Sequence, residues 1–186
     1  MQNPRYRSSV FKVTASALLI AIGILIPMVS PIRVIIEPAS FTLASHVAIF
    51  IAMFISPAVA VAVTFGTTLG FFLGGFPLII VIRAASHVIF VIAGSLYLQR
   101  IDKFNISVIH LRIFSLAVAL IHALFELIGV LLFYFGTNVP VDSSLFLWAL
   151  GFVGLGTVIH SVVDMEIANI VRLALQKQRH FKELAR

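Results

Sequence analysis

The sequence predicts an all-α integral membrane protein, a six-transmembrane-helix bundle with an ordered outer loop between helices 1 and 2. Two observations lead to this class. Of the 186 residues, 61% are hydrophobic and only 11% are charged, and the mean hydropathy is +1.13. Water-soluble domains are about half apolar and about a quarter charged. The composition therefore excludes a water-soluble globule, and the length fits one membrane domain over residues 1–186.

The basic residues give the chain a net charge of +6, and they flank the apolar stretches. They do not form a stripe with interleaved aromatic residues, so nucleic-acid binding is not predicted. The absence of cysteine excludes a disulfide scaffold and thiolate metal sites. A lipid bilayer is the predicted surrounding.

The first predicted span covers 13–29, because this stretch is apolar and ends at the Ser30-Pro31 pair. No small-residue cleavage site precedes the following loop, which indicates a retained helix rather than a cleaved signal. Residues 32–45 contain Arg33, Glu37 and Pro38 and are too polar and too broken to cross. They are predicted to form the outer loop.

A charge-free run of 45 residues extends from Pro38 to Ile82. As one helix it would be about 68 Å long, roughly twice the hydrocarbon thickness. Breaks are predicted at Ser56-Pro57 and at the run from Gly74 to Pro77, because proline and glycine interrupt helices. The remaining predicted spans are 45–55, 58–74, 78–98, 113–135 and 145–174.

The distribution of Lys and Arg predicts the orientation of these spans. An even number of crossings places both termini on one side, together with the 56–57 turn and the 99–112 loop. Eleven Lys and Arg residues lie on that side, and Arg33 is alone in the loops of the other. The positive-inside rule therefore predicts cytoplasmic termini.

Small residues recur at helical spacing in two spans. Gly66, Gly70 and Gly74 are four residues apart, which aligns them on one helix face and predicts close packing inside the bundle. Ala17 and Ala21 have the same spacing in the first span. They fit either internal packing or an outward groove for a partner helix.

Ionisable side chains inside a membrane cost ~2.5–3.5 kcal/mol each on insertion scales and often mark function. Arg83 and His87 lie four residues apart in the fourth span, as do His122 and Glu126 in the fifth. With His46, they are predicted to converge in the outer half, beneath the loop. Arg83 fits two interpretations: an internal ion pair with Glu126, or a ligand for a carboxylate substrate. Each of the three histidines fits either a ligand contact or a contact between helices.

The sixth span carries His160 and Asp164, which are predicted nearer the cytoplasmic half, where Asp164 pairs with Arg172 or meets headgroups. A metal site built from these residues with His122 and Glu126 is conceivable, but no specific metal motif supports it, and neither metal nor cofactor is predicted. No phosphate loop or nucleophile elbow is present. The sequence therefore favours a protein that binds and moves a solute over an enzyme.

Several stretches show a resemblance to a known family. The six short spans, Ala17 and Ala21, the ordered loop and the basic tail resemble the S components of energy-coupling factor (ECF) vitamin transporters. The runs EPASFTLASHV (37–47), FIAMFISP (50–57), GGFP (74–77) and RAASH (83–87) are similar to the niacin-specific branch. The resemblance covers nearly the whole chain.

The resemblance implies a subunit in the cytoplasmic membrane of a bacterium that binds a vitamin from outside beneath the loop. It also implies partners: a transmembrane T protein, which contacts Ala17 and Ala21, and two ATPases that hydrolyse ATP.

For nicotinate, the resemblance makes Arg83 the expected carboxylate ligand. His87 or Asn138 would bind the pyridine nitrogen, and His46 and Glu126 would complete the polar wall. Ring contacts are expected from three aromatic residues, Phe41, Phe72 and Phe76.

Other functions remain open from the sequence. The same class of protein could bind pyridoxine, hydroxymethylpyrimidine or pantothenate. Proteins of other classes, an intramembrane enzyme that uses the His and carboxylate pairs or a stand-alone secondary carrier, also fit the residues.

Overall fold

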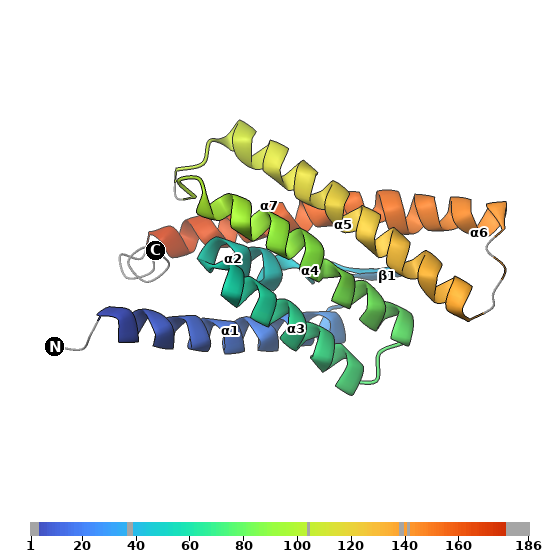
Figure 1. The fold of residues 1–186 in the computed structure, drawn as a ribbon, viewed down its shortest axis with the longest axis horizontal. Coiled ribbons are helices and arrows are strands. Elements are labelled where there is room, and N and C mark those ends of the chain that lie inside the picture. Colours follow the sequence, from blue (N-terminus) through green and yellow to red (C-terminus); the bar gives the residue numbers. More distant parts are fainter. Residues whose placement is uncertain (1–3, 37–38, 104, 138–139, 141, 178–186) are drawn as a thin grey trace.

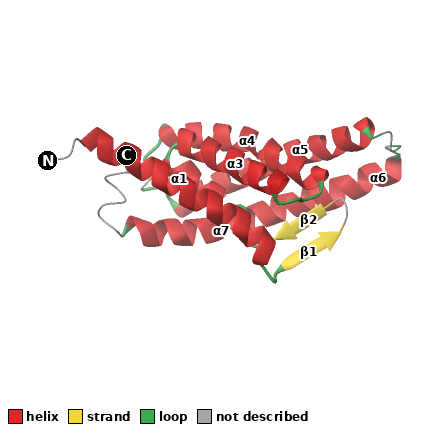
Figure 2. Cartoon of the chain, turned by 90° about the horizontal axis from the view of Figure 1, so that it is seen from below, coloured by secondary structure: helices red, strands yellow, loops and turns green. Residues whose placement is uncertain are grey.

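The computed structural model describes residues 4–36, 39–103, 105–137, 140 and 142–177. The described chain is nearly all helical, with one small sheet (Figure 2). The elements, in chain order, are α1 (Pro4–Val29), β1 (Arg33–Ile36), β2 (Ala39–Thr42), α2 (Val47–Ile55), α3 (Pro57–Leu73), α4 (Leu78–Gln99), α5 (Val108–Gly136), α6 (Ser143–Trp148), the π-helical segment η1 (Ala149–Leu155) and α7 (Gly156–Gln176).

The long helices form an elongated bundle with α2 in its interior (Figure 1). α2 packs against α1, α3, α4 and α7, and all nine of its residues are buried. Its high apolar content therefore serves the protein core rather than lipid.

The structure does not confirm the predicted count of six spans. Among the described residues, four helical stretches are long and apolar enough to cross a bilayer: 8–29, 78–99, 108–136 and 143–176. α3 is apolar but shorter, at 17 residues. α2, the predicted span 45–55, is only about 14 Å long and cannot cross a hydrocarbon core of ~30 Å.

Three helix ends also differ from the prediction. α1 begins at Pro4 rather than at residue 13. α5 begins at Val108 rather than 113, because the Ser107 hydroxyl accepts a hydrogen bond from the His110 backbone N–H and caps the helix. The last helical stretch begins at Ser143, is capped by Asp142 and contains the π-helical segment η1.

The predicted outer loop contains a β-hairpin, so the fold is not purely α-helical. β1 and β2 pair antiparallel, with Arg33 opposite Thr42 and Ile36 opposite Ala39. β-branched residues in 34–36 favour this extended conformation. The hairpin lies beside the last helical stretch, and β2 contacts η1 and α7 (Figure 2).

The predicted glycine face on α3 is confirmed for two of its three residues. A Cβ added to Gly66 or Gly70 would clash with Ile20 or Ile24 of α1, so the two backbones approach closely there. Gly74 instead ends α3. The N-terminal end of α1, the α4–α5 connection and the C-terminal end of α7 lie at the same end of the bundle (Figure 1).

Candidate functional site

A cavity of about 460 Å³ lies between the hairpin and the helices. Its walls come from α1, both strands and α2 to α5, so segments far apart in the sequence enclose it. Apolar residues dominate the lining, with a polar group on one side that includes Arg83, His87, His46 and Glu126. An apolar cavity with a few convergent polar groups is the usual form of a small-molecule site.

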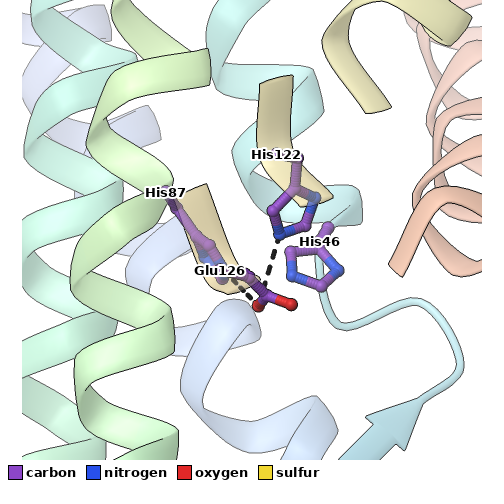
Figure 3. Close-up of side chains that lie close together, drawn as sticks. All are labelled: His46, His87, His122 and Glu126. Atoms are coloured by element: carbon purple, nitrogen blue, oxygen red, sulfur yellow. Dashed lines mark hydrogen bonds and ion pairs between the residues drawn. The ribbon is translucent and has the colours of Figure 1, made fainter. Parts of the chain in front are cut away.

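Glu126 is the centre of the polar group, and it is 2% exposed. Its Oε2 atom accepts hydrogen bonds from Arg83 Nη2 at 3.0 Å and from the Thr157 hydroxyl at 2.6 Å. Its Oε1 atom lies 3.0 Å from His87 Nε2 and 3.4 Å from His122 Nε2. Figure 3 shows these two contacts and His46 beside them. The carboxylate is thus bound by side chains of three helices.

Arg83 is 5% exposed and forms the predicted ion pair with Glu126. Its Nη1 atom also donates to the Ser40 carbonyl at 3.5 Å, and its guanidinium lies 5.6 Å from the centre of the Phe41 ring. Because Ser40 and Phe41 belong to β2, Arg83 connects the hairpin to α5 through Glu126. The same residue lines the cavity.

His46 precedes α2 and lies deep in the bundle, where three other histidines surround it. The centroid of its ring is 4.8 Å from that of His87, 4.7 Å from His122 and 4.9 Å from His160. The predicted convergence of the ionisable residues of spans 2, 4 and 5 is therefore confirmed.

The predicted pairing of Asp164 with Arg172 is wrong, because Asp164 and His160 contact His46 instead. Asp164 accepts hydrogen bonds from the backbone N–H groups of Ala44, at 2.7 Å, and His46, at 2.9 Å. Arg172 instead donates to Asn169 and to the Lys103 carbonyl. A carboxylate at the N-terminus of α2 is stabilised by the helix dipole and by these N–H groups.

The three phenylalanines predicted to contact the ligand ring lie at different positions relative to the cavity. Phe76 lines the cavity and stacks on Phe71 with ring centroids 4.7 Å apart. Phe41 packs between Arg83 and His160. Phe72 is 60% exposed and does not line the cavity. Asn138 lies outside the described residues.

Most cavity residues had no predicted role as ligands, among them three threonines and an arginine with side chains suited to binding an anion. Thr64, Thr67 and Thr68 of α3 line the wall, and the hydroxyls of Thr67 and Thr68 are buried without a hydrogen-bond partner among the described atoms. Arg33 of β1 is exposed and also borders the cavity. Two features of the sequence could have indicated these residues: threonines at helical spacing in an apolar helix, and a lone cation in the predicted outer loop.

Ala17 and Ala21 lie on an exposed face of α1, whereas Leu19 and Gly23 face the bundle. The interpretation that this alanine pair packs internally is therefore wrong within the described structure. The exposed small residues leave a shallow face on which another helix can lie close.

The fold and the cavity define a multi-pass membrane protein with a partly polar cavity inside its helical bundle. The chain is 35% identical over 162 residues to "Niacin transporter NiaX" of Lactococcus lactis subsp. cremoris (strain MG1363), and the alignment covers 87% of this chain and 73% of that protein. The chain belongs to the family of this transporter, which confirms the resemblance to the niacin-specific branch of S components. No family model matches the chain, and no solved structure matches it.

Proposed function

We propose that the chain is the nicotinate-binding S component of an ECF importer. The observation that carries the proposal is the Arg83 guanidinium, which Glu126 holds at the wall of the cavity. Nicotinate is an anion at neutral pH, and a guanidinium binds a carboxylate through two parallel hydrogen bonds. The similarity to a protein named as a niacin transporter supports the same vitamin.

The remaining lining fits the pyridine ring. The stacked pair of Phe71 and Phe76 offers an aromatic face, and the unpaired hydroxyls of Thr67 and Thr68 offer hydrogen bonds to a ring nitrogen or a carboxylate. His87 lies on the polar side and is the donor expected from the sequence. The volume lies within the range of ~300–1,000 Å³ typical of ligand cavities.

Arg33 supplies a second positive charge in this proposal. Because Glu126 already neutralises Arg83, an arriving carboxylate needs another cation to balance its charge. Arg33 borders the cavity and forms no ion pair with another described residue. We assign Arg33 to the capture of the anion at the mouth, Arg83 to its final position, and Glu126 to the positioning of Arg83 and His87.

The exposed face of α1 fits the partner interface implied by the resemblance. Ala17 and Ala21 would contact the T protein of the ECF module, and the two ATPases of that module would hydrolyse ATP. In this proposal the chain lies in the bacterial cytoplasmic membrane with both termini cytoplasmic, and the hairpin and α2 together make the second of six passes.

Calorimetry on the purified chain in detergent tests the substrate. Tight binding of nicotinate, with much weaker binding of nicotinamide, supports the proposal. A preference for pyridoxine or hydroxymethylpyrimidine contradicts a carboxylate site, and a preference for pantothenate contradicts the niacin assignment. Trp148 is a poor reporter because it stacks on Phe152 and does not line the cavity.

Uptake into vesicles separates the S component from a stand-alone carrier. Transport of labelled nicotinate that requires the T protein and both ATPases supports the S component. Equal uptake by this chain alone contradicts it.

A further inference from the structure

Three side-chain atoms that can bind a metal ion lie close together where the end of the hairpin contacts α7. His46 Nδ1 lies 3.1 Å from His160 Nε2 and 3.2 Å from Asp164 Oδ2, and the latter two atoms are 3.3 Å apart. Asp164 is fully buried, His46 is 8% exposed, and the His160 side chain is 10% exposed. Two imidazoles and a carboxylate thus form a nearly equilateral triangle away from bulk water.

Hydrogen bonds satisfy only part of this triangle. Asp164 already accepts two backbone N–H groups. If both ring nitrogens carry protons toward its Oδ2 atom, two hydrogens face each other across the edge between the imidazoles. If only one nitrogen is protonated, its single hydrogen is aimed at one neighbour. The Ser45 hydroxyl, 3.1 Å from His160 Nε2, can donate to one further atom, but lone pairs still face each other along the remaining edge. One cation near the three atoms makes all three contacts attractive.

We propose that His46, His160 and Asp164 bind a divalent transition-metal ion of the zinc type. Zinc binds imidazole nitrogen and carboxylate oxygen at ~2.0–2.2 Å in tetrahedral geometry, which separates neighbouring ligand atoms by roughly 3.3–3.5 Å. The three observed edges are close to this separation. The carboxylate retains free lone pairs after accepting the two N–H groups, because it offers about four acceptor sites.

The fourth ligand position of such an ion lies toward the cavity. The Ser45 hydroxyl is 3.1 Å from His160 Nε2 and 3.3 Å from His46 Nδ1, and Ser45 and His46 both line the cavity. Three protein ligands with a fourth position for water or hydroxyl are typical of accessible zinc sites. The ion would tie the C-terminal end of the hairpin to α7.

A second group of donors, His46, His87, His122 and Glu126, is the competing location. The Arg83 guanidinium is already 3.0 Å from Glu126 and would repel a second cation there. Within the described part of the chain, no Arg or Lys side chain forms a hydrogen bond or ion pair with Asp164. Charge therefore favours the triangle that contains Asp164.

Zinc titration of the full chain tests the proposal. The protein is purified in detergent, its affinity tag is removed, and it is stripped with a chelator and dialysed. Zn²⁺ is then added under calorimetry, with metal content measured after desalting. We expect one tightly bound ion per chain, and His160→Gln should weaken binding by more than about 100-fold, since loss even of a group that only supports a metal ligand costs 10–100-fold.

Two matched histidine variants locate the ion. His110 forms a hydrogen bond with Tyr97 in a distant part of the bundle. His110→Gln should therefore leave zinc affinity unchanged. His122→Gln should also retain it, because His122 belongs only to the competing group. Loss of binding in His122→Gln but not in His160→Gln overturns the proposed location. Absence of tight binding, or equal loss in all variants, overturns the site itself. Nicotinate is absent from this assay, so its outcome is separate from that of the proposed function.

Discussion

The ion pair between Arg83 and Glu126 permits a test that separates ligand binding from folding. Replacing Arg83 by methionine removes the guanidinium that lies 3.0 Å from a carboxylate with 2% exposure. Breaking a buried pair by removal of one partner costs about 3–5 kcal/mol, because the other charge is left uncompensated. Arg83→Met should therefore lower stability as well as nicotinate affinity, and binding loss in this variant alone proves nothing.

The double variant Arg83→Met/Glu126→Gln resolves the ambiguity. The glutamine carbonyl can still accept the Thr157 hydroxyl, which is 2.6 Å from Oε2 in the native protein, and no buried charge remains unpaired. Replacement of a complete buried pair by neutral groups is often nearly neutral in stability. Affinity for nicotinate should stay low, by about 2–5 kcal/mol, or roughly 30-fold to several thousand-fold, because the cation that binds the carboxylate is still missing.

Thermal unfolding in detergent and calorimetric titration with nicotinate measure both quantities on the four corners of the cycle. Glu126→Gln alone should gain more thermal stability from nicotinate than the native protein does, since the ligand carboxylate then pairs with Arg83. Recovery of both stability and nicotinate affinity in the double variant would refute the role of Arg83 as a ligand. Arg33→Met serves as the exposed control, with an expected effect below about 1 kcal/mol on stability.

Three further changes test the hairpin contact, the proposed partner face on α1 and the connection between α4 and α5. A Cβ on Gly156 would meet the Phe41 ring at 2.7 Å, so Gly156→Ala should displace the hairpin and weaken nicotinate binding about tenfold in calorimetry, whereas unchanged affinity would show that the ring moves freely. Ala21→Leu lies on the exposed face of α1 and should retain nicotinate binding while losing copurification with the ECF module; retained copurification would count against this interface. Burial lowers the pKa of Lys103, and the charge of Lys12 is a smaller cause. Just below the ordinary lysine pKa of about 10.4, the unfolded chain therefore binds more protons at this residue than the folded protein does. Thermal stability should therefore gain from rising pH in that window, and Lys103→Met should remove this gain; an identical pH profile in the variant would contradict it.

The sequence was sufficient to predict the meeting of Arg83, His87 and Glu126. Residues four apart share a helix face, and an ionisable group in a membrane helix faces the protein interior rather than lipid. These two rules bring the pairs on α4 and α5 together without knowledge of the full fold. The bond from Glu126 to Thr157 was not predictable, because it depends on the rotation of α7 against α5.

The length and position of α2 could not be predicted in the same way. A charge-free apolar segment has the same composition whether it faces lipid or lies inside a bundle, so hydropathy alone does not distinguish a full span from a buried half-span. The hairpin takes the chain into the bundle before α2 begins. His46 therefore lies deep enough to contact Asp164. The number of residues between Asp164 and the predicted start of its span did not indicate this contact.

The two ends of the hairpin are held very differently, and this predicts where it opens. On the β2 side, Ala44 and His46 donate backbone N–H groups to Asp164, and two hydrogen bonds to a charged group contribute about 3–6 kcal/mol together. On the β1 side, Val34 is 54% exposed. We therefore expect nicotinate to enter past β1, with the segment that follows β2 acting as the fixed hinge.

Spin labels can measure this motion, because the chain has no native cysteine. Val34→Cys and the matched Leu43→Cys are each paired with Val108→Cys, which lies at the start of α5. Nicotinate should shift or narrow the distance distribution from residue 34 and leave that from residue 43 unchanged, since only β1 closes over the ligand. Equal changes at both positions would mean that the whole hairpin moves, and the carboxylate of Asp164 would then have to release its two N–H donors in every binding cycle.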